Sequence, residues 1–463
     1  MITSVYIDGF KSFSQFYMEF SPLTVIVGTN ASGKSNLFDA LRLLANLSTM
    51  DLRSAFASKQ LRGEVSELFT RFSDTVTASQ MHFVVEMLVP RSISDNWGGT
   101  SEVKTPRLRY ELKIAKRVNK MGYDELSVAY EQLSSIASDK DKWAKKYLNK
   151  RTELWKRHSG GGSAKPYIYT EQEKGHQTIK IRQDGGRSGR SALANAVNQT
   201  VLGSINSVDF PHIYAAQQEM SHWNFMQLNP ELLREPTRYD ANYTGDLIGH
   251  AGENLAAALF RLHSHEPYIL QKIILRLSSF LPEFTELKVR DDKANKQFVF
   301  ELQNNEGKIF SSRVLSEGTL RLLVLCVLLY DDKYQGLLCF EEPENGIHPA
   351  RMRAMVSLLR MLASDFSDTE VSLRQVIVNS HSPVLLRCLK EEYNDQDSNV
   401  SIWFSKLITR TMMCDNQKVM AKVSRITPLT RSFQYTISES ERLMTLADAA
   451  NYLKTEQPDY HQP

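Results

Sequence analysis

The sequence predicts an α/β fold built on a parallel sheet, and three observations support this prediction. Residues 23–27 form a continuous apolar and β-branched run, which is typical of a strand buried on both faces of a parallel sheet. This run ends at Gly28, and apolar residues with helical spacing follow from about residue 34 to residue 47. Two later apolar runs, residues 337–340 and 375–379, have the same buried character. Buried strands that alternate with helices are typical of α/β proteins.

Length and composition describe a globular chain. The 463 residues allow two or three domains, and 56 Lys and Arg against 53 Asp and Glu give a net charge of +3. A nucleic-acid-binding surface would therefore have to come from local clustering of charge. Four cysteines without a CxxC pair argue against a disulfide scaffold and against a zinc ribbon. Without a secretion signal or a membrane-length apolar run, we expect a soluble, cytoplasmic protein with no membrane contact.

The other elements are predicted in chain order. Near the N-terminus, strands around residues 5–7 and 16–20 are expected to pair. The further predicted elements are strands at residues 81–88, 107–116, 126–132 and 210–216, a hairpin at 167–181, helices within 254–280, a hairpin at 298–310 and a helix after Leu315.

Residues 133–210 are predicted to form an arm inserted into the compact core. Between residues 140 and 157, eight basic side chains face only two acidic ones, and a Ser-Gly-Gly-Gly-Ser hinge follows at residues 159–163. The basic residues are Lys140, Lys142, Lys145, Lys146, Lys150, Arg151, Lys156 and Arg157.

Three aromatic residues lie within this basic segment. Trp143, Tyr147 and Trp155 are spaced so that on one helix they would share a side. Two interpretations stay open. The segment is either a solvated basic face whose aromatic side chains pack on the core, or a docking surface for DNA or for another protein.

The strongest motif is Gly-Thr-Asn-Ala-Ser-Gly-Lys-Ser at residues 28–35, which matches G-x-x-x-x-G-K-[ST] between a strand and a helix. Such a loop directs backbone N–H groups and a helix N-terminus at phosphates, with Lys34 on the β and γ oxygens and Ser35 on Mg²⁺. This context favours nucleotide binding over a plain glycine turn. The predicted nucleotide-binding residues of the loop are Gly28, Asn30, Gly33, Lys34, Ser35 and Asn36.

A second motif ends the apolar run at residues 337–340. Glu341 and Glu342 follow it directly, before Pro343. A carboxylate at the C-terminal end of a strand in an open α/β sheet lies in the ligand crevice. One acid could hold the magnesium shell and the other could orient a water molecule. Two such glutamates alone are more often solvated loop charges, but an intact phosphate-binding loop reverses that preference.

Two weaker signals complete the set. Ser316 suits the N-cap of an apolar helix, and Gly318 would let an anion approach the N-terminus of that helix. His381 comes directly after the predicted strand at residues 375–379. A single histidine in such a place is usually structural.

The order of these motifs resembles ATP-binding-cassette (ABC) ATPases of the SMC/RecF class. More narrowly, it resembles predicted ATPases related to overcoming-lysogenisation-defect proteins, many of which serve in bacterial anti-phage systems. The resemblance implies an ABC-type ATPase head with a P-loop sheet, an antiparallel β-subdomain and a helical lobe, and it does not cover the arm. The segments that carry it are residues 10–13 (Phe-Lys-Ser-Phe), 254–258, 315–320 and 341–349.

The resemblance implies roles for individual residues. Glu341 would be the Walker B acid on Mg²⁺, Glu342 would polarise the attacking water, and His381 would be the switch histidine. Ser316 and Gly318 would contact ATP bound to a second copy of the chain.

This sequence departs from the family pattern at three positions. Glu341 replaces the usual Asp, and Glu317 and Thr319 replace the common Gly and Gln of the signature. A further family feature, a Q-loop glutamine after a strand, is assigned to Gln217 behind the predicted strand at residues 210–216.

The implied domain organisation has five parts. They are an N-terminal lobe of the head at residues 1–132, the basic arm at 133–210, a helical lobe with a hairpin at 211–310, a C-terminal lobe of the head at 311–456 and a flexible tail at 457–463.

The implied function is that of a Mg²⁺-dependent ATPase. ATP-dependent dimerisation of its heads would sense a trigger and hold or activate a separate effector, such as a nuclease, as in the PARIS or Septu defence systems. A Toprim nuclease domain is not expected, because the late D-x-D at Asp395 and Asp397 lies in a polar loop. Two alternatives remain: a RecF-like DNA-repair ATPase that acts directly on DNA, and a nucleotide-gated clamp with little turnover.

Overall fold

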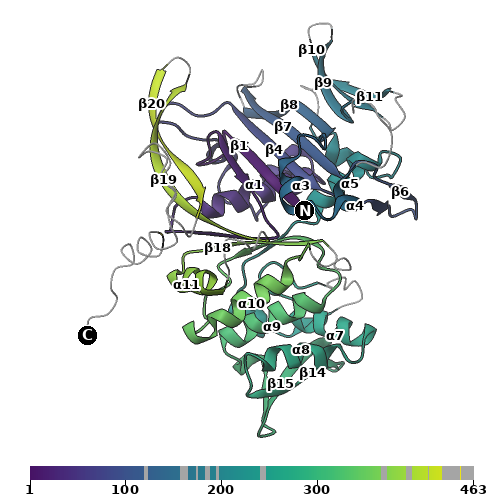
Figure 1. Cartoon of the computed structure of the whole chain (residues 1–463), viewed down its shortest axis with the longest axis vertical. Helices are drawn as coiled ribbons and strands as arrows, with labels where there is room; N and C mark the ends of the chain where they lie inside the picture. Colours follow the sequence, from purple (N-terminus) through teal and green to yellow (C-terminus); the bar gives the residue numbers. More distant parts are fainter. Residues whose placement is uncertain are drawn as a thin grey trace. The chain divides into compact units, whose positions relative to one another are not determined.

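The structure is a computed structural model, and its chain divides into two compact units. Unit 1 comprises residues 1–21, 29–223 and 403–427, and unit 2 comprises residues 22–28, 224–402 and 428–463 (Figure 1). The described residues are 1–118, 122, 124–156, 165–173, 176–182, 188–193, 198–239, 247–366, 373–392, 399–414, 417–429 and 449. The predicted hinge at residues 159–163, Arg157, the D-x-D at Asp395 and Asp397 and the tail at 457–463 lie outside this set.

Unit 1 is built on an eight-stranded antiparallel sheet in the order β11-β10-β9-β8-β7-β4-β1-β2. Its strands alternate buried and less buried residues, as in β1, where Val5 and Ile7 are fully buried. The sheet strands are β1 (Ile2–Asp8), β2 (Phe16–Glu19), β4 (Gln80–Leu88), β7 (Arg107–Val118), β8 (Asp124–Ser135), β9 (Ile168–Glu173), β10 (His176–Arg182) and β11 (Ser188–Leu193). A separate small hairpin joins β5 (Ser92–Ser94) to β6 (Thr100–Glu102).

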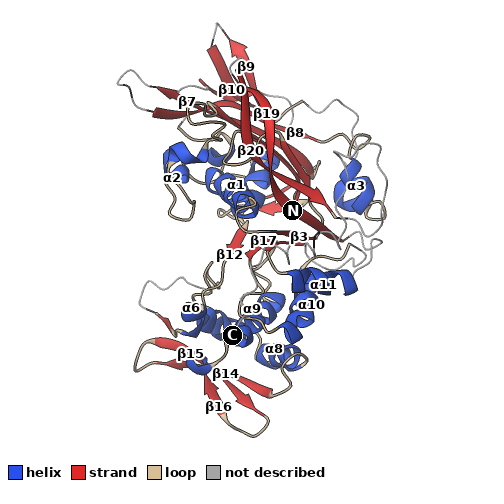
Figure 2. Ribbon diagram, turned by 90° about the vertical axis from the view of Figure 1, so that its left-hand side faces the viewer, coloured by secondary structure: helices blue, strands red, loops and turns tan. Residues whose placement is uncertain are grey.

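Unit 1 also contains helices (Figure 2). Helix α1 (Lys34–Leu47) has the predicted bounds and buries Leu37, Leu41 and Leu44 along one face. The others are α2 (Leu52–Phe56), α3 (Lys142–Tyr147), α4 (Thr152–Trp155) and α5 (Pro211–Ser221).

The segment predicted as an inserted arm is part of unit 1. Within residues 133–210, β9, β10 and β11 extend the eight-stranded sheet, so the described part of this segment is not a separate body. The basic stretch forms two short helices, α3 and α4, instead of the single helix on which Trp143, Tyr147 and Trp155 would share a side.

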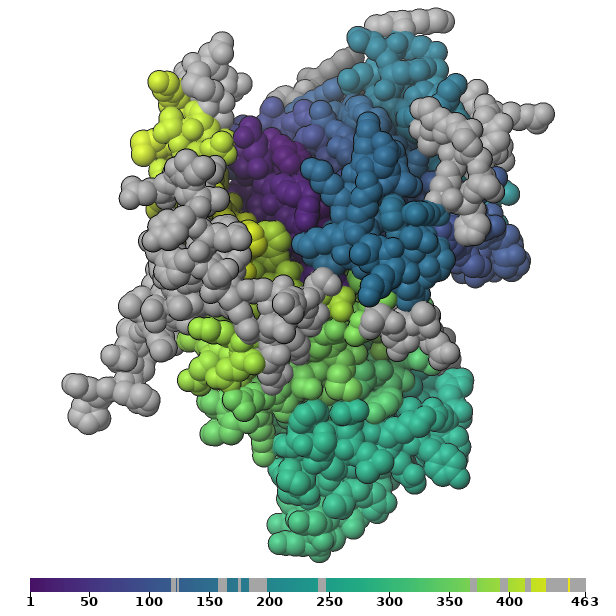
Figure 3. All heavy atoms as spheres, in the orientation of Figure 1, coloured from purple at the N-terminus to yellow at the C-terminus, as the bar shows by residue number. Residues whose placement is uncertain are grey.

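The aromatic residues of this stretch pack on the core. Trp143 is buried and its Nε1 donates to the Phe20 carbonyl at 2.7 Å, while Trp155 Nε1 donates to the Leu148 carbonyl at 2.9 Å. Tyr147 is half-buried and lies against Trp143, with 4.9 Å between the ring centroids. The basic side chains remain at the surface of unit 1, where the segment is blue in Figure 3. The exposed lysines are Lys140, Lys142, Lys145, Lys146, Lys150 and Lys156.

Unit 2 contains the four parallel strands of a six-stranded sheet, in the order β12-β17-β18-β3. All six residues of β3 are buried, which confirms the prediction made from the run at residues 23–27. The strands are β12 (Asn224–Met226), β17 (Gly336–Glu341), β18 (Arg374–Ser380) and β3 (Leu23–Gly28).

Helices and a smaller antiparallel sheet complete unit 2. The predicted helical region at residues 254–280 is α7 (Leu255–His265) followed by α8 (Ile269–Ser278), and the predicted hairpin at 298–310 joins β15 (Gln297–Asn304) to β16 (Ile309–Ser311). The remaining elements are α6 (Pro230–Arg234), β13 (Thr237–Arg238), β14 (Phe284–Asp292), α9 (Glu317–Tyr330), α10 (Met352–Leu362) and α11 (Pro383–Glu392).

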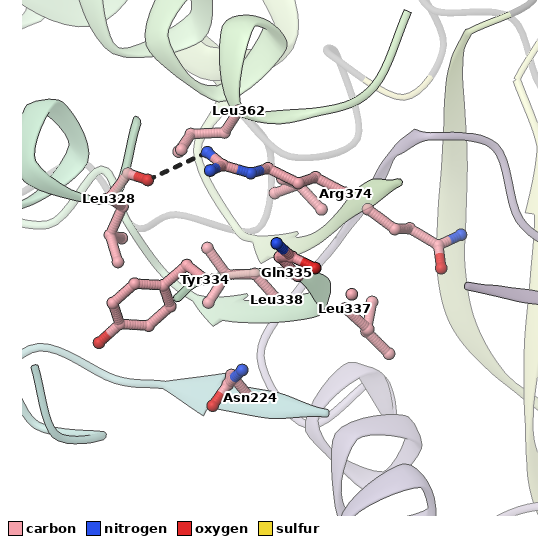
Figure 4. A pocket seen from close by; sticks show the side chains of 11 residues that line it. Asn224, Leu328, Tyr334, Gln335, Leu337, Leu338, Leu362 and Arg374 are labelled. Carbon is pink, nitrogen blue, oxygen red and sulfur yellow. Dashed lines mark hydrogen bonds between the residues drawn. The ribbon is translucent and has the colours of Figure 1, made fainter. Parts of the chain in front are cut away.

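A small pocket lies where β17 and β18 begin, and Arg374 is one of the residues that line it (Figure 4). Arg374 Nη1 donates to the carbonyls of Leu328 and Leu329 at 3.3 and 3.0 Å, and Nη2 donates to the Asp331 carbonyl at 3.2 Å. The guanidinium therefore caps the C-terminal end of α9. Ligands of open α/β sheets bind at the opposite ends of the strands, so this pocket has a structural explanation.

The chain's last described strands are β19 (Val400–Cys414) and β20 (Gln417–Pro428), which follow β3 in the six-stranded sheet β12-β17-β18-β3-β19-β20. We call this pair of strands the C-terminal ribbon (Figure 1, yellow). Residues 403–427 of this ribbon belong to unit 1. Among the described residues, no helix is both long and apolar enough to cross a membrane.

Candidate nucleotide-binding site

The phosphate-binding loop leaves β3 at Gly28 and leads into α1 at Lys34. Ala31 and Gly33 have left-handed backbone conformations, with φ of 60° and 96°, so the loop turns sharply twice. Helix α1 has no side-chain cap and no acid in its first turn. The positive end of its dipole therefore favours an anion at this loop.

Two side chains of this loop fit a bound phosphate. The Lys34 side chain is buried and its Nζ donates to the Thr29 carbonyl at 2.7 Å, which places the ammonium group over its own loop. The Ser32 hydroxyl is buried, and no other group in the described part of the chain bonds to it. A cation and an unsatisfied hydroxyl at an uncapped helix N-terminus suit the oxygens of a phosphate.

The other predicted residues of the loop differ in their surroundings. Asn30 is exposed and Ser35 is half-buried. Asn36 Nδ2 donates to Ser12 Oγ at 2.8 Å, so this amide supports the loop from the Phe-Lys-Ser-Phe segment.

In unit 2, the carboxyl ends of β3, β17 and β18 share one edge of the parallel sheet. Val27 is in register with Ser380, and Glu341 with Asn379. The first glycine of the P-loop, Gly28, therefore leaves the sheet at the edge that also carries Glu341 and Ser380. This is the edge where ligands of open α/β sheets bind.

Glu342 is held by three groups at this edge. Its backbone has a left-handed φ of 47°, and its N–H donates to the Asn379 carbonyl at 3.0 Å. Its Oε1 lies 3.0 Å from His381 Nδ1, and its Oε2 accepts from Asn345 Nδ2 at 2.9 Å. Both Glu342 and His381 are about 30% exposed, at 29% and 31% of their side chains. The structure thus brings together the two residues that were predicted to be catalytic.

The neighbouring acid, Glu341, bonds to the adjacent strand β18. Asn379 Nδ2 donates to Glu341 Oε1 at 3.3 Å. A carboxylate and the Ser35 hydroxyl are the hard oxygen donors that Mg²⁺ prefers, because the ion usually keeps several waters and takes few protein ligands. The donor chemistry therefore fits the predicted metal role.

Sequence reasoning missed Glu344. This residue is buried, and its Oε1 accepts from the hydroxyl of Ser380, the residue directly before His381. Burial raises the pKa of the Glu344 carboxyl above its ordinary value. The signal was present in the sequence, because Glu344 lies within the family segment at residues 341–349.

Ser316 and Gly318 serve the start of α9. Ser316 is the N-cap, and its Oγ accepts from the Thr319 N–H at 3.1 Å. A β-carbon on Gly318 would lie 2.9 Å from the Gly346 carbonyl oxygen. The glycine therefore lets α9 pack closely on the loop after Glu342, a reason beyond the predicted approach of an anion.

The strand predicted before Gln217 is wrong, because residues 211–221 form helix α5. Gln217 is buried, donates to the Ser48 carbonyl at 3.1 Å and accepts from Gln218 Nε2 at 2.9 Å. The amide thus ties α5 to the end of α1, and the reason for naming it a Q-loop residue is removed.

A parallel sheet whose first strand runs into G-x-x-x-x-G-K-[ST] defines a P-loop ATPase fold. Residues 1–386 match the model of the AAA ATPase domain family, and the chain belongs to that family. No curated protein matches the sequence.

Two solved structures are similar in fold. One is the SMC head domain from Thermotoga maritima, with 13% identity and a TM-score of 0.37 over 92% of this chain and 98% of that one. The other is the Smc head domain with an extended coiled coil bound to the C-terminal domain of ScpA, derived from Pyrococcus furiosus, with 13% identity and a TM-score of 0.44 over 93% and 96%. Neither similarity says what this chain binds.

Proposed function

We propose that this protein binds ATP with Mg²⁺ and hydrolyses it, using the P-loop together with Glu341, Glu342 and His381. One observation carries the proposal: the P-loop starts from the same sheet edge at which Glu342 and His381 lie 3.0 Å apart. Membership of an ATPase family supports it independently.

The chain's own residues supply positioning and charge. The P-loop N–H groups and Lys34 bind the phosphates, and Ser35 with Glu341 would hold Mg²⁺, which neutralises phosphate charge when it is bound. Asn345 and His381 fix the two oxygens of Glu342, so that this carboxylate can orient a water molecule and accept its proton. Glu344 and Ser380 fix the turn that carries His381.

A second copy of the chain is part of this proposal. Ser316 and Gly318 lie at the N-terminus of α9, which is 14 residues long and opens with a side-chain cap. In the proposed mechanism this helix end contacts the γ-phosphate of ATP bound to the other copy, so that two chains close around the nucleotide.

At the level of biology, we propose that the ATP-dependent dimer holds or activates a separate effector protein in the cytoplasm, in anti-phage defence. A RecF-like ATPase acting on DNA is the second candidate, favoured by the six exposed lysines between residues 140 and 156. A clamp with little turnover is less favoured, because the hydrogen-bonded Glu342 and His381 suit hydrolysis.

The test is the Lys34→Ala variant. Loss of a charge-assisted contact to a triphosphate should reduce ATP hydrolysis at least about a hundredfold and weaken ATP binding. Steady-state ATPase assays and calorimetric titration with ATP measure both effects. Lys59→Ala, which removes an exposed lysine of the same unit, is the control and should behave like the parent protein. Full ATPase activity in Lys34→Ala protein would refute the proposal.

A further inference from the structure

The C-terminal ribbon bonds to the backbone of the P-loop. The Ser32 carbonyl oxygen accepts two hydrogen bonds from the ribbon, one from Ser405 Oγ at 2.9 Å and one from Ser424 Oγ at 3.1 Å. Both hydroxyls are buried, and both are more than 370 positions away from Ser32 in the sequence. All three residues belong to unit 1.

The hydrogen bonds of this cluster form one series in which each donor can be assigned. A serine hydroxyl has one proton, and that of Ser424 goes to the Ser32 carbonyl. The 2.7 Å contact between the Ser12 and Ser424 hydroxyls must therefore have Ser12 as its donor, and Ser12 in turn accepts from Asn36 Nδ2. This series of hydrogen bonds runs from Asn36 on α1 to the Ser32 carbonyl in the P-loop, and together with the backbone it forms a ring that includes Gly33. Each hydrogen bond in the series polarises the next.

A backbone hydrogen bond and a close contact at Gly33 also hold the ribbon next to the P-loop. The Ser424 N–H donates to the Ser12 carbonyl at 2.8 Å, which holds the ribbon against the Phe-Lys-Ser-Phe segment. A β-carbon on Gly33 would lie 1.8 Å from Ser424 Oγ. The second glycine of the motif is thus required by the ribbon's contact as well as by its left-handed φ.

Fixing the Ser32 carbonyl also fixes the next N–H group. A trans peptide is planar, so the C=O of Ser32 and the N–H of Gly33 point in opposite directions. With the carbonyl bonded to the ribbon, the Gly33 N–H points away from the ribbon and cannot rotate without breaking two hydrogen bonds. Such pre-orientation removes a reorganisation that phosphate binding would otherwise have to drive.

We propose that Ser405 and Ser424 are positioning residues of the nucleotide site, which orient the Ser32–Gly33 peptide of the P-loop for phosphate binding. The proposal deepens the proposed ATPase function and rests on it. It makes the ribbon, which lies beyond the family match at residues 1–386, a working part of the ATP site.

The experiment is the double variant Ser405→Ala/Ser424→Ala. Loss of two buried hydrogen bonds to one carbonyl should raise the KM for ATP about tenfold, while kcat changes by less than about twofold, because the bonds act on binding and not on the reacting atoms. The Kd for ATP from calorimetry should rise with KM. The matched control is Ser401→Ala, which removes a hydroxyl of the same strand that bonds to Thr24 Oγ1 at 3.3 Å, and its KM should stay within about twofold of the parent.

Several outcomes decide the proposal. An unchanged KM in the double variant overturns it, as does an equal loss in Ser401→Ala, which would indicate a general effect on the strand. If the double variant does not fold, hydrogen exchange of the parent protein decides instead. ATP should then slow exchange in residues 403–427 and leave residues 284–304 unchanged, and no ATP-dependent slowing overturns the proposal. If the parent protein itself fails to bind ATP, the proposed function fails and not this inference alone.

Discussion

The carboxyl group of Glu131 accepts three hydrogen bonds inside unit 1. The N–H groups of Val201 and Leu202 donate to it at 2.7 and 2.8 Å, and the Tyr110 hydroxyl donates at 3.0 Å. Burial raises the pKa of Glu131 to about 7, although these donors favour the charged form. One residue of β8 thus holds the chain around residues 200–202 against the sheet.

This pKa gives unit 1 a pH-dependent stability. Above pH 4.5 the unfolded chain releases the Glu131 proton, whereas the folded chain keeps it until about pH 7. Stability is therefore present at low pH and decreases as the pH rises from about 4.5 to 7. We expect the Glu131 contribution to fall by roughly 2–3 kcal/mol over this range.

Urea unfolding at pH 5 and pH 8 checks this prediction. Glu131→Gln cannot titrate, so its stability should differ less between the two pH values than that of the parent protein. An identical pH dependence in both proteins would contradict the assignment.

Helix α3 is anchored to the sheet by a buried ion pair. Arg107 of β7 donates from Nε to Asp141 Oδ2 at 2.6 Å, and both side chains are at most 2% exposed. Asp141 also caps α3 by accepting from the Ala144 N–H at 2.9 Å. The guanidinium lies 5.1 Å from the ring centroid of Trp143. The ion pair and the helix cap therefore hold the segment that carries the exposed lysines on the sheet.

Asp141→Ala should destabilise unit 1 by about 3–5 kcal/mol, because it leaves a buried guanidinium unpaired. Denaturation with urea measures the loss. Glu153→Ala is the control, since Glu153 is more than half exposed and pairs with Arg151 at the surface, so its removal should cost less than about 1 kcal/mol. A loss below 1 kcal/mol in Asp141→Ala would show that the pair does not anchor the helix.

The elements that sequence patterns predicted well have strong local signals. Helix α1 starts after Gly33 and carries Leu37, Leu41 and Leu44 at helical spacing, and β3 is apolar throughout. The strand predicted at residues 210–216 was wrong because a short apolar run is compatible with a buried strand and with a buried helix. Pro211 at the first helical position was the available clue.

The candidate site was only partly predictable. Motifs indicated Glu342 and His381, and the structure places them in contact. Ser405 and Ser424 belong to no sequence motif. The role of a serine in a strand depends on the groups that it contacts in the structure, and the sequence does not show those contacts. The same holds for the segment at residues 133–210, whose strands join a sheet that is completed by residues far away in the sequence.

At the scale of the whole molecule, the proposed mechanism needs two chains. Glu342→Gln should still bind ATP but hydrolyse it at least about a hundredfold more slowly, because the amide cannot accept the water proton. The ATP-bound dimer should then persist. Sedimentation velocity with ATP should show dimers of Glu342→Gln protein and monomers of the Lys34→Ala/Glu342→Gln double variant. Monomers of Glu342→Gln at saturating ATP would contradict the mechanism.

The bonds between the P-loop and the ribbon also have a consequence during synthesis. Ser32 leaves the ribosome long before its two partners, because Ser405 and Ser424 are added more than 370 residues later. At about 5–20 residues per second, the loop waits roughly 20 to 75 seconds for these partners. A nascent chain that stops at residue 386 would contain the whole family match and still lack them. The nucleotide-binding loop therefore gains its last hydrogen bonds only after the ribbon has been synthesised, so a nascent chain that lacks the ribbon cannot present a fully bonded loop.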